Sequence, residues 1–207
     1  MGKKFKILLL LISSSFTLGL MSNTYSRYVA NTTGDVELVF AKWQILVNNE
    51  DITNGTTSTL DITPVIEENQ NIEDNTIAPS SKGYFDVNID PSNVGVSFNY
   101  KIDLKVLNED MPDLMITKYA ILDKDYIDGD EITTTNIENN IINGTLDFDK
   151  ETENYKFEPF TIRVYFEWYE GLDEQMNDEQ DSKVGNDASI NDTKLQIQAT
   201  INFEQKI

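Results

Sequence analysis

Three stretches of the chain alternate apolar and polar side chains with a period of two residues. They cover residues 94–106, 160–168 and 195–203. Because successive side chains of a β-strand point to opposite faces, this pattern predicts strands with one buried face and one solvated face. Such strands are typical of antiparallel sheets. The pattern therefore constrains the body of the chain to sheets that cover each other's apolar faces.

Other stretches extend this all-β prediction. Five shorter segments are rich in apolar residues and are also predicted as strands: 39–47, 60–62, 84–89, 113–122 and 146–148. We see no convincing amphipathic helix. The polar segment 170–193 is predicted as a flexible solvated loop, with cation binding or a subunit contact as alternatives. We therefore predict an antiparallel β-sandwich or jelly roll of about seven to eight strands, forming a single domain over residues 27–207.

The N-terminal region has the order typical of an export signal. A mostly apolar run of 15 residues, 7–21, is short for a membrane span, which needs about 20 residues. It suits the apolar core of a signal peptide. Three lysines and no acidic residue precede the run: Lys3, Lys4 and Lys6. We therefore expect residues 1–26 to be a signal peptide and the mature chain to be secreted.

The cleavage site is predicted from two small residues. Thr24 and Ser26 have the spacing of the −3 and −1 positions that a signal peptidase recognises. Cleavage is therefore expected between Ser26 and Arg27. An uncleaved signal anchor is the alternative.

The composition excludes several classes of site and partner. The chain has no Cys and no His, which excludes thiol nucleophiles, disulfides, Cys/His zinc sites and His-based triads. A Cys-free exported protein fits a bacterium without an oxidative folding compartment, such as a Gram-positive. Beyond residue 26 the chain carries 13 basic and 36 acidic residues, a net charge of −23. Because such a surface repels polyanions, we expect no nucleic-acid partner and no membrane contact after signal cleavage.

A cluster of carboxylates is the best candidate for a metal site. Asp123, Asp125, Asp128 and Asp130 lie within eight residues, and closely spaced carboxylates are the ligands that calcium prefers. The first two fit an EF-hand loop, but Asp128 is one residue late and Thr134 stands where the closing Glu belongs. The two interpretations are a calcium site at these four residues and a solvated acidic hairpin loop.

No enzyme motif stands out. Among 36 acidic residues, a carboxylate pair suited to glycoside hydrolysis has no specificity. The chain has no Gly-x-Ser-x-Gly elbow and no phosphate-binding Gly loop. Trp43 and Trp168 are predicted to pack in the core, with a carbohydrate-stacking platform as the alternative. Tyr165 and Tyr169 face the other way and are candidates for a contact surface. We expect a non-catalytic protein without a cofactor, calcium being the alternative.

Several segments resemble the TasA/camelysin group, small exported proteins of Gram-positive bacteria with a SipW-type signal peptide. Residues 24–28, Thr-Tyr-Ser-Arg-Tyr, resemble the cleavage site of that group. Residues 39–48 are similar to its Ala-Lys-Trp strand, and residues 77–89 to its Ala-Pro turn and following strand. Phe-Glu-Trp at 166–168, followed by an Asn/Asp-rich loop and a final strand, also fits.

The resemblance implies a jelly roll and a structural function. Better-known members of the group build extracellular fibres of the biofilm matrix, in which the N-terminal segment of one subunit completes a sheet of the next. In this chain the donor segment would be residues 27–39, with Arg27, Tyr28, Val29 and Val36 as subunit contacts. The expected partners are further copies of the chain and matrix or cell-surface components. The alternative is a monomeric secreted binding module for calcium or a glycan. Part of the group has been labelled metallopeptidase, which the absence of His opposes here.

Overall fold

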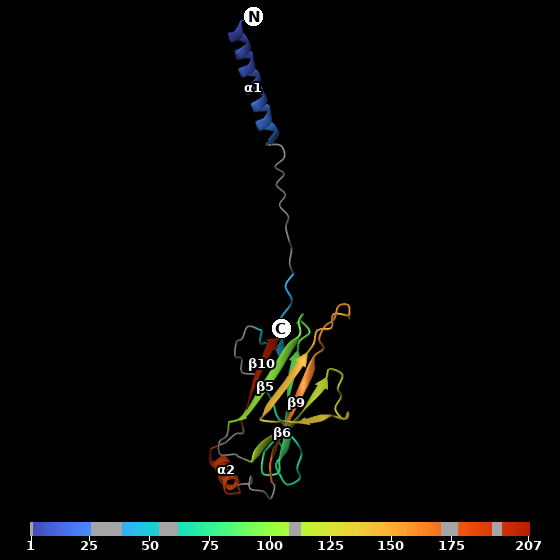
Figure 1. The fold of residues 1–207 in the computed structure, drawn as a ribbon. Coiled ribbons are helices and arrows are strands. Elements are labelled where there is room, and N and C mark those ends of the chain that lie inside the picture. The colour runs from blue at the N-terminus through green and yellow to red at the C-terminus, as the bar shows by residue number, and fades with distance from the viewer. Residues whose placement is uncertain (1, 26–38, 54–61, 108–112, 171–177, 192–195) are drawn as a thin grey trace. The chain divides into compact units, whose positions relative to one another are not determined.

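The computed structural model describes residues 2–25, 39–53, 62–107, 113–170, 178–191 and 196–207. The chain divides into two units, residues 1–40 and residues 41–207. The first contains helix α1 (Lys3–Tyr25), which covers the predicted export signal (Figure 1). Among the described helices, none combines enough length with enough apolar character to cross a membrane.

The second unit consists mainly of two antiparallel sheets (Figure 1). The larger sheet has the order β2-β1-β4-β9-β6-β7, and β3 also pairs with β4. Its strands are β1 (Leu46–Val47), β2 (Glu50–Asp51), β3 (Val65–Ile66), β4 (Lys82–Asp90), β6 (Leu114–Asp123), β7 (Thr134–Asn136) and β9 (Phe160–Trp168). The smaller sheet has the order β10-β5-β8. Its strands are β5 (Phe98–Val106), β8 (Ile141–Leu146) and β10 (Ile197–Gln205).

The core takes side chains from both sheets. Alternate residues of the central strands are buried, as in Phe85, Val87 and Ile89 of β4. The Tyr100 ring of β5 lies 5.7 Å from the Phe160 ring of β9, so the apolar sides of the two sheets meet there. Full burial of each large apolar side chain contributes about 1.5–3 kcal/mol to folding. This shared core explains why one-sided strands are stable here.

The main strands confirm the predicted antiparallel all-β class. The predicted strands 84–89, 113–122 and 160–168 coincide with β4, β6 and β9 within one or two residues. The strand predicted from residue 94 begins later, at Phe98, because the backbone N–H of Gly95 donates to the Lys42 carbonyl instead of joining a ladder. The predicted C-terminal strand is displaced by two residues, to β10.

Two weaker strand predictions do not hold over their whole length. Of residues 39–47, only Leu46 and Val47 pair in a ladder. Val39 and Phe40 are 93% and 89% exposed, so apolar character there does not reflect burial. Strand β8 ends at Leu146, before the rest of the predicted segment 146–148. Residues 60 and 61 lie outside the described residues.

The prediction of a flexible loop over residues 170–193 is wrong for much of its length. Helix α2 (Asp178–Asn191) forms there. Two residues on one face attach it to the sheets: Val184 joins the core, and Asp181 accepts a hydrogen bond of 2.9 Å from the indole N–H of Trp168. Positions three apart lie on the same helix face. Val184 is the buried apolar residue of this helix, so the helix leaves no apolar stripe in the sequence.

Two local features shape the strands. Asn48 and Asn49 join β1 to β2 with φ angles of 48° and 68°, the left-handed conformation that tight two-residue hairpins require and that Asn tolerates well. In β8, Gly144 pairs with Tyr100. A Cβ atom at Gly144 would lie 2.1 Å from the Tyr100 ring, so only glycine leaves room for that ring over β8.

Candidate functional site

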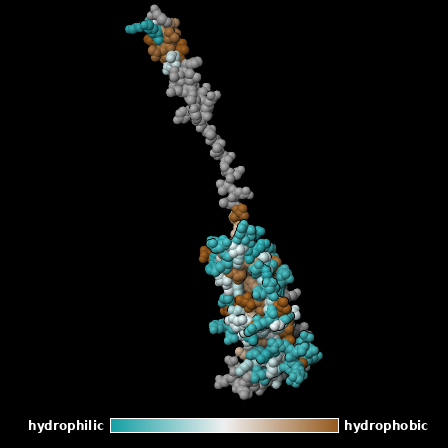
Figure 2. All heavy atoms as spheres, turned by 90° about the vertical axis from the view of Figure 1, so that its right-hand side faces the viewer, coloured by the Kyte–Doolittle hydropathy of each residue, from teal (hydrophilic) through white to brown (hydrophobic). Residues whose placement is uncertain are grey.

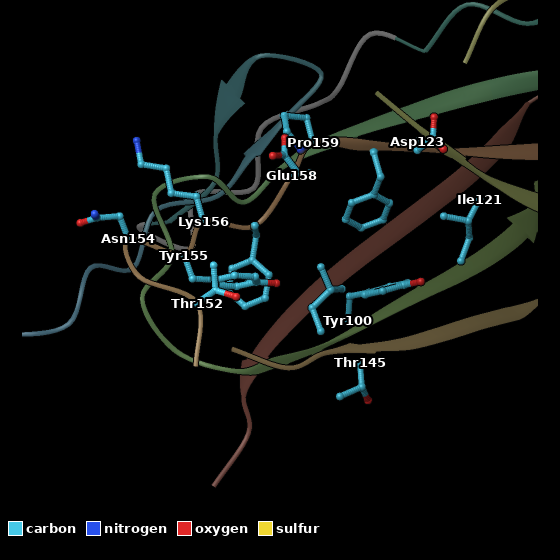
Figure 3. Close-up of a pocket in the computed structure, with 13 residues that line it drawn as sticks. Tyr100, Ile121, Asp123, Thr145, Thr152, Asn154, Tyr155, Lys156, Glu158 and Pro159 are labelled. Carbon is cyan, nitrogen blue, oxygen red and sulfur yellow. The ribbon is translucent and has the colours of Figure 1, made fainter. Parts of the chain in front are cut away.

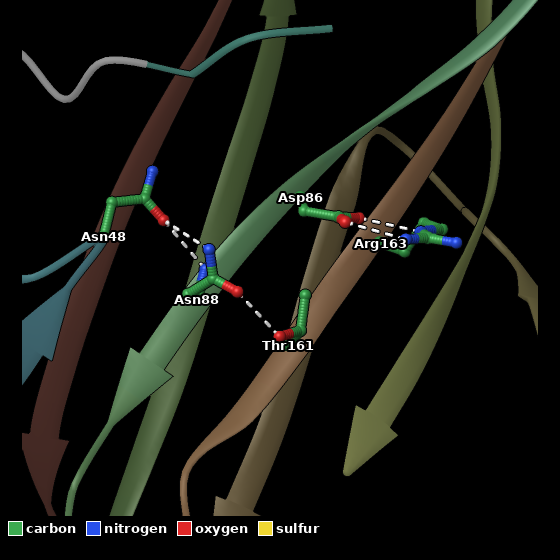
Figure 4. Close-up of polar contacts among 5 residues, drawn as sticks. All are labelled: Asn48, Asp86, Asn88, Thr161 and Arg163. Atoms are coloured by element: carbon green, nitrogen blue, oxygen red, sulfur yellow. Dashed lines mark hydrogen bonds and ion pairs between the residues drawn. The ribbon is translucent and has the colours of Figure 1, made fainter. Parts of the chain in front are cut away.

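The outer face of the larger sheet contains a partly buried ion pair at its centre. Asp86 of β4 and Arg163 of β9 are opposite each other in the ladder. The Nε and Nη2 atoms of Arg163 donate to the two carboxylate oxygens of Asp86, both at 2.8 Å (Figure 4). These hydrogen bonds raise the pKa of the Arg163 guanidinium, which burial opposes. Arg163 is only 8% exposed, so this bidentate pair holds a charge inside the surface layer.

Aromatic rings surround this ion pair. The Arg163 guanidinium carbon lies 4.0 Å from the centre of the Tyr84 ring and 5.5 Å from that of Tyr126. The Tyr84 and Tyr165 rings are 6.0 Å apart, and Lys118 Nζ lies 5.0 Å from the Tyr165 ring. Such cation–π contacts stabilise both partners. We call this set the tyrosine–arginine cluster: Tyr84, Asp86, Lys118, Tyr126, Arg163 and Tyr165.

The sequence identified only part of this cluster. Tyr165 was predicted to belong to a contact surface, and it does lie on the outer face. Its neighbours come from other strands through the register, which pairs Tyr165 with Tyr84 on one side and with Lys118 on the other. A bulge between Ile116 and Lys118 sets the second pairing. Alternation alone does not reveal which strands are neighbours, so the cluster was not predictable as a unit.

A row of amide and hydroxyl groups crosses the same sheet. The side-chain oxygen of Asn48 accepts from the backbone N–H of Asn88 at 2.9 Å. The Thr161 hydroxyl donates to the Asn88 side-chain oxygen at 2.8 Å (Figure 4). These bonds link the β1–β2 hairpin, β4 and β9. Each of these groups bonds a neighbouring strand, so the row joins strands across the exposed face.

The predicted acidic site forms a turn after β6. One Asp123 oxygen accepts from the backbone N–H of Asp125 at 3.1 Å, and one Asp130 oxygen accepts from that of Ile127 at 3.1 Å. Asp128 lies between them on the chain. Within the residues that the structure describes, no three acidic side chains come close enough together to hold a metal ion. A calcium site at Asp123, Asp125, Asp128 and Asp130 therefore stays a prediction.

This turn is connected to other parts of the surface. Tyr126 reaches the tyrosine–arginine cluster. The Lys124 ammonium donates to Glu158 at 2.7 Å, which raises the pKa of Lys124. Both Asp123 and Glu158 line a groove that begins beside the turn. The acidic turn thus joins the outer face of the larger sheet to the groove.

The groove has a volume of about 790 Å³. Figure 3 labels Tyr100, Ile121 and Tyr155 in the apolar lining of the groove, which also includes Leu146, Phe157, Pro159 and Phe160. The polar lining residues are Asp123, Thr145, Thr152, Asn154, Lys156 and Glu158. Aromatic walls with a polar rim are typical of sites for organic ligands.

Tyr100 lines the groove with a phenol whose proton is held tightly. Burial raises the pKa of Tyr100 to about 12, and the neighbouring Tyr119 adds to the rise. The Tyr100 phenol therefore stays protonated at neutral pH. The arrangement is suited to contact and hydrogen bonding.

The two tryptophans pack differently. Trp168 is 4% exposed and belongs to the core, which confirms core packing and leaves no face for stacking a sugar. Trp43 is half-buried, with its ring 6.1 Å from that of Phe98 in an edge-to-face contact. That contact belongs to an aromatic group that also includes Phe157. Neither tryptophan lines the groove.

The residues predicted for signal cleavage and subunit contact fall mostly outside the described part. Thr24 lies in helix α1. The others lie outside the described residues: Ser26, Arg27, Tyr28, Val29 and Val36. The cleavage site and the donor segment therefore stay predictions.

Comparisons of the chain with known protein families, with curated proteins and with solved structures found no match. The resemblance to the TasA/camelysin group therefore also stays a prediction that depends on the short segments quoted above.

Proposed function

We propose that the chain is a secreted, non-catalytic structural protein of the extracellular matrix or cell surface that self-associates by β-strand addition. Its two sheets would form a sandwich of the jelly-roll kind. The signal peptide would be removed between Ser26 and Arg27. Mass spectrometry of the exported protein tests this last step, and a mature chain that begins at another residue would contradict it.

One observation carries the proposal. The smaller sheet has only three strands, and in the described part of the chain both outer strands, β10 and β8, pair on one side only. An edge strand presents backbone N–H and C=O groups that an added strand can bind. The donor would be residues 27–39, which precede the sheet unit in the chain. Val39 at the end of this segment and Phe40 directly after it are largely exposed, as apolar residues awaiting a partner would be.

The surface charge sets the conditions for assembly. The mature chain would carry a net charge of −23, so subunits repel one another at long range. The face in Figure 2 agrees with this composition, since hydrophilic side chains dominate the sheet unit there with small hydrophobic areas between them. Salt screens such repulsion, with a Debye length of about 8 Å at physiological ionic strength.

Electron microscopy tests the proposal. The chain starting at Arg27 is expected to form fibres or regular oligomers in negative stain, more readily with salt, with millimolar calcium or at mildly acidic pH. Deletion of residues 27–36 should abolish the fibres while the circular dichroism of the sheets is kept. A chain with the same ten residues in scrambled order is the matched control for length and composition. Unchanged fibres after deletion would remove the donor segment from the mechanism.

The groove favours a second candidate function, a monomeric binding module. Its aromatic walls suit a glycan, and the acidic turn beside it suits calcium. Calorimetric titration with calcium and with soluble matrix glycans tests this function. Asp123→Asn together with Asp130→Asn should weaken calcium binding, and Tyr155→Ala should weaken glycan binding. Persistent monomers under every assembly condition, with measurable binding, would replace the first proposal by this one.

A further inference from the structure

Strand β10 differs from ordinary edge strands in its charge. Of its nine residues, Ile197 to Gln205, only Glu204 is charged, and none is Pro or Gly. The central strand β5 carries more charge, with Lys101, Asp103 and Lys105. Native proteins usually protect long edges with charged residues or Pro, because an uncharged edge pairs with other chains. In a chain this acidic, a nine-residue edge with a single charged residue points to a partner strand.

The core under β10 is also incompletely covered. Ile201 and Phe203 pack against the core but remain partly exposed. Their partners on β5 are buried, with Ile102 at 0% and Tyr100 at 4% exposure. A further strand beside β10 would cover these apolar side chains as β10 covers those of β5.

The hydrogen bonds fix which backbone groups of β10 are available. Leu107 N–H donates to the Gln196 carbonyl, and Lys206 N–H donates to the Ser97 carbonyl, both at 2.9 Å. Both pairs belong to the register that joins β10 to β5. Because hydrogen-bonded pairs alternate along an antiparallel ladder, the even-numbered residues of β10 bond to β5. The odd-numbered residues therefore direct their N–H and C=O groups to the side of β10 on which no described strand pairs: Ile197, Ala199, Ile201, Phe203 and Gln205.

We propose that two copies of the chain pair through β10, antiparallel, about a two-fold axis at Ile201. The axis at Ile201 is the centre that pairs all nine residues of the strand. Every odd-numbered residue then faces an odd-numbered residue, so about ten backbone hydrogen bonds can form. The two three-stranded sheets become one sheet of six strands. This interface needs no N-terminal donor segment and goes beyond the proposed function.

The side chains are complementary in this register. Ala199 faces Phe203 of the other copy, a small residue against a large one. Thr200 faces Asn202, and Glu204 faces Gln198, so no like charges lie opposite each other. Cross-strand pairs of this kind stabilise a sheet, whereas like charges directly opposite destabilise it. The edge is therefore self-complementary, as an interface with two-fold symmetry has to be.

The first test places like charges across the proposed axis. Thr200 and Asn202 are exposed on the solvent side of β10, so Thr200→Lys with Asn202→Lys leaves the core unchanged and puts two pairs of lysines opposite each other. The dissociation constant of the dimer is measured by analytical ultracentrifugation of the full chain as its host processes it. We expect this constant to rise about tenfold in the variant. The variant is also less negative overall, which by itself would favour association. A general charge effect therefore cannot explain weaker association, which would point to the β10 strand.

The matched control changes an edge strand of the larger sheet. Thr134→Lys with Asn136→Lys introduces the same two changes, two residues apart, on the exposed edge strand β7. This control should dimerise within about twofold of the unmodified chain. Equal dimerisation of the β10 variant and the control, or an unmodified chain that stays monomeric at every concentration, would overturn the proposal.

The second test measures the register directly. The chain has no native cysteine, so chains with Thr200→Cys and chains with Asn202→Cys can be mixed and oxidised. Facing Cα atoms in a non-hydrogen-bonded pair are about 4.5 Å apart, within disulfide range. This mixture should cross-link, whereas Thr200→Cys mixed with Gln198→Cys should not. Cross-linking of both mixtures alike would refute the register. Deletion of residues 27–36 should leave the dimer intact, which separates this interface from the proposed fibre contact.

Discussion

Replacement of Asp86 by Asn is expected to destabilise the sheet unit by about 2 kcal/mol. In Asp86→Asn, the amide keeps a single acceptor oxygen and loses the charge, so Arg163 keeps at most one of its two 2.8 Å bonds. Loss of a buried ion-pair partner costs about 3–5 kcal/mol. The Arg163 side chain is 10% exposed but that of Asp86 is 31% exposed, and solvent screening reduces the effect. A cost of about 2 kcal/mol follows, which lowers Tm by about 4–8 °C at this chain length.

The measurement is urea and thermal unfolding followed by circular dichroism. Glu167→Gln is the control, since Lys82 and Glu167 form a looser ion pair on the same sheet face. The Lys82 Nζ and Glu167 Oε2 atoms are 3.7 Å apart, and the two side chains are 62% and 29% exposed. Its cost should be below about 0.5 kcal/mol. A third variant, Asp86→Asn with Arg163→Met, should recover part of the loss, because no unpaired charge remains buried.

Two outcomes would refute this reasoning. Equal costs for Asp86→Asn and Glu167→Gln would show that the buried geometry adds nothing to an exposed ion pair. A combined variant that is less stable than Asp86→Asn alone would show that Arg163 acts through its packing on Tyr84 rather than through its charge.

The other predictions concern single features of the fold. Gly144→Ala should destabilise the chain by about 1–3 kcal/mol in urea unfolding, because its Cβ would meet the Tyr100 ring. Gly185→Ala in helix α2, whose Cβ would meet nothing within 4 Å, should stabilise the chain by about 0.5–1 kcal/mol. Equal effects of the two variants would contradict the packing argument. Because burial raises the pKa of Tyr100 from 10.0 to about 12, its contribution to stability is complete below pH 10 and is lost as pH rises to about 12. Tyr100→Phe should make the loss of stability at alkaline pH less steep. An unchanged pH profile would assign this loss of stability to other groups. Asp181→Ala should cost about 1 kcal/mol and shift the fluorescence of Trp168, whose N–H it leaves without that acceptor; an unshifted spectrum would mean that helix α2 does not depend on this bond.

The long strands were predictable because each has one buried and one wet face. Strands β4, β5, β6, β9 and β10 are nine or ten residues long, enough for alternation to stand out from chance. Strands β1, β2 and β3 have two residues each, and such short strands are fixed by their tertiary partners rather than by local pattern.

The candidate surfaces were less predictable than the strands. Tyr126 belongs to the acidic segment in sequence but to the tyrosine–arginine cluster in space, because the turn after β6 folds toward β9. The β10 edge was visible as a strand, but its exposure depends on the order of strands in the smaller sheet. Sequence alternation reports which face of a strand is buried and carries no information about which neighbour lies on either side.

The separation in sequence between paired strands has a consequence for the time course of folding. Asp86 and Arg163, which meet across β4 and β9, are 77 residues apart, and the strand that completes the smaller sheet is the last one in the chain. Chains dominated by such distant pairings fold slowly, in milliseconds to seconds. The larger sheet needs the chain as far as β9 and the smaller sheet needs β10, so a chain still being made or moved would keep its smaller sheet open until β10 arrives.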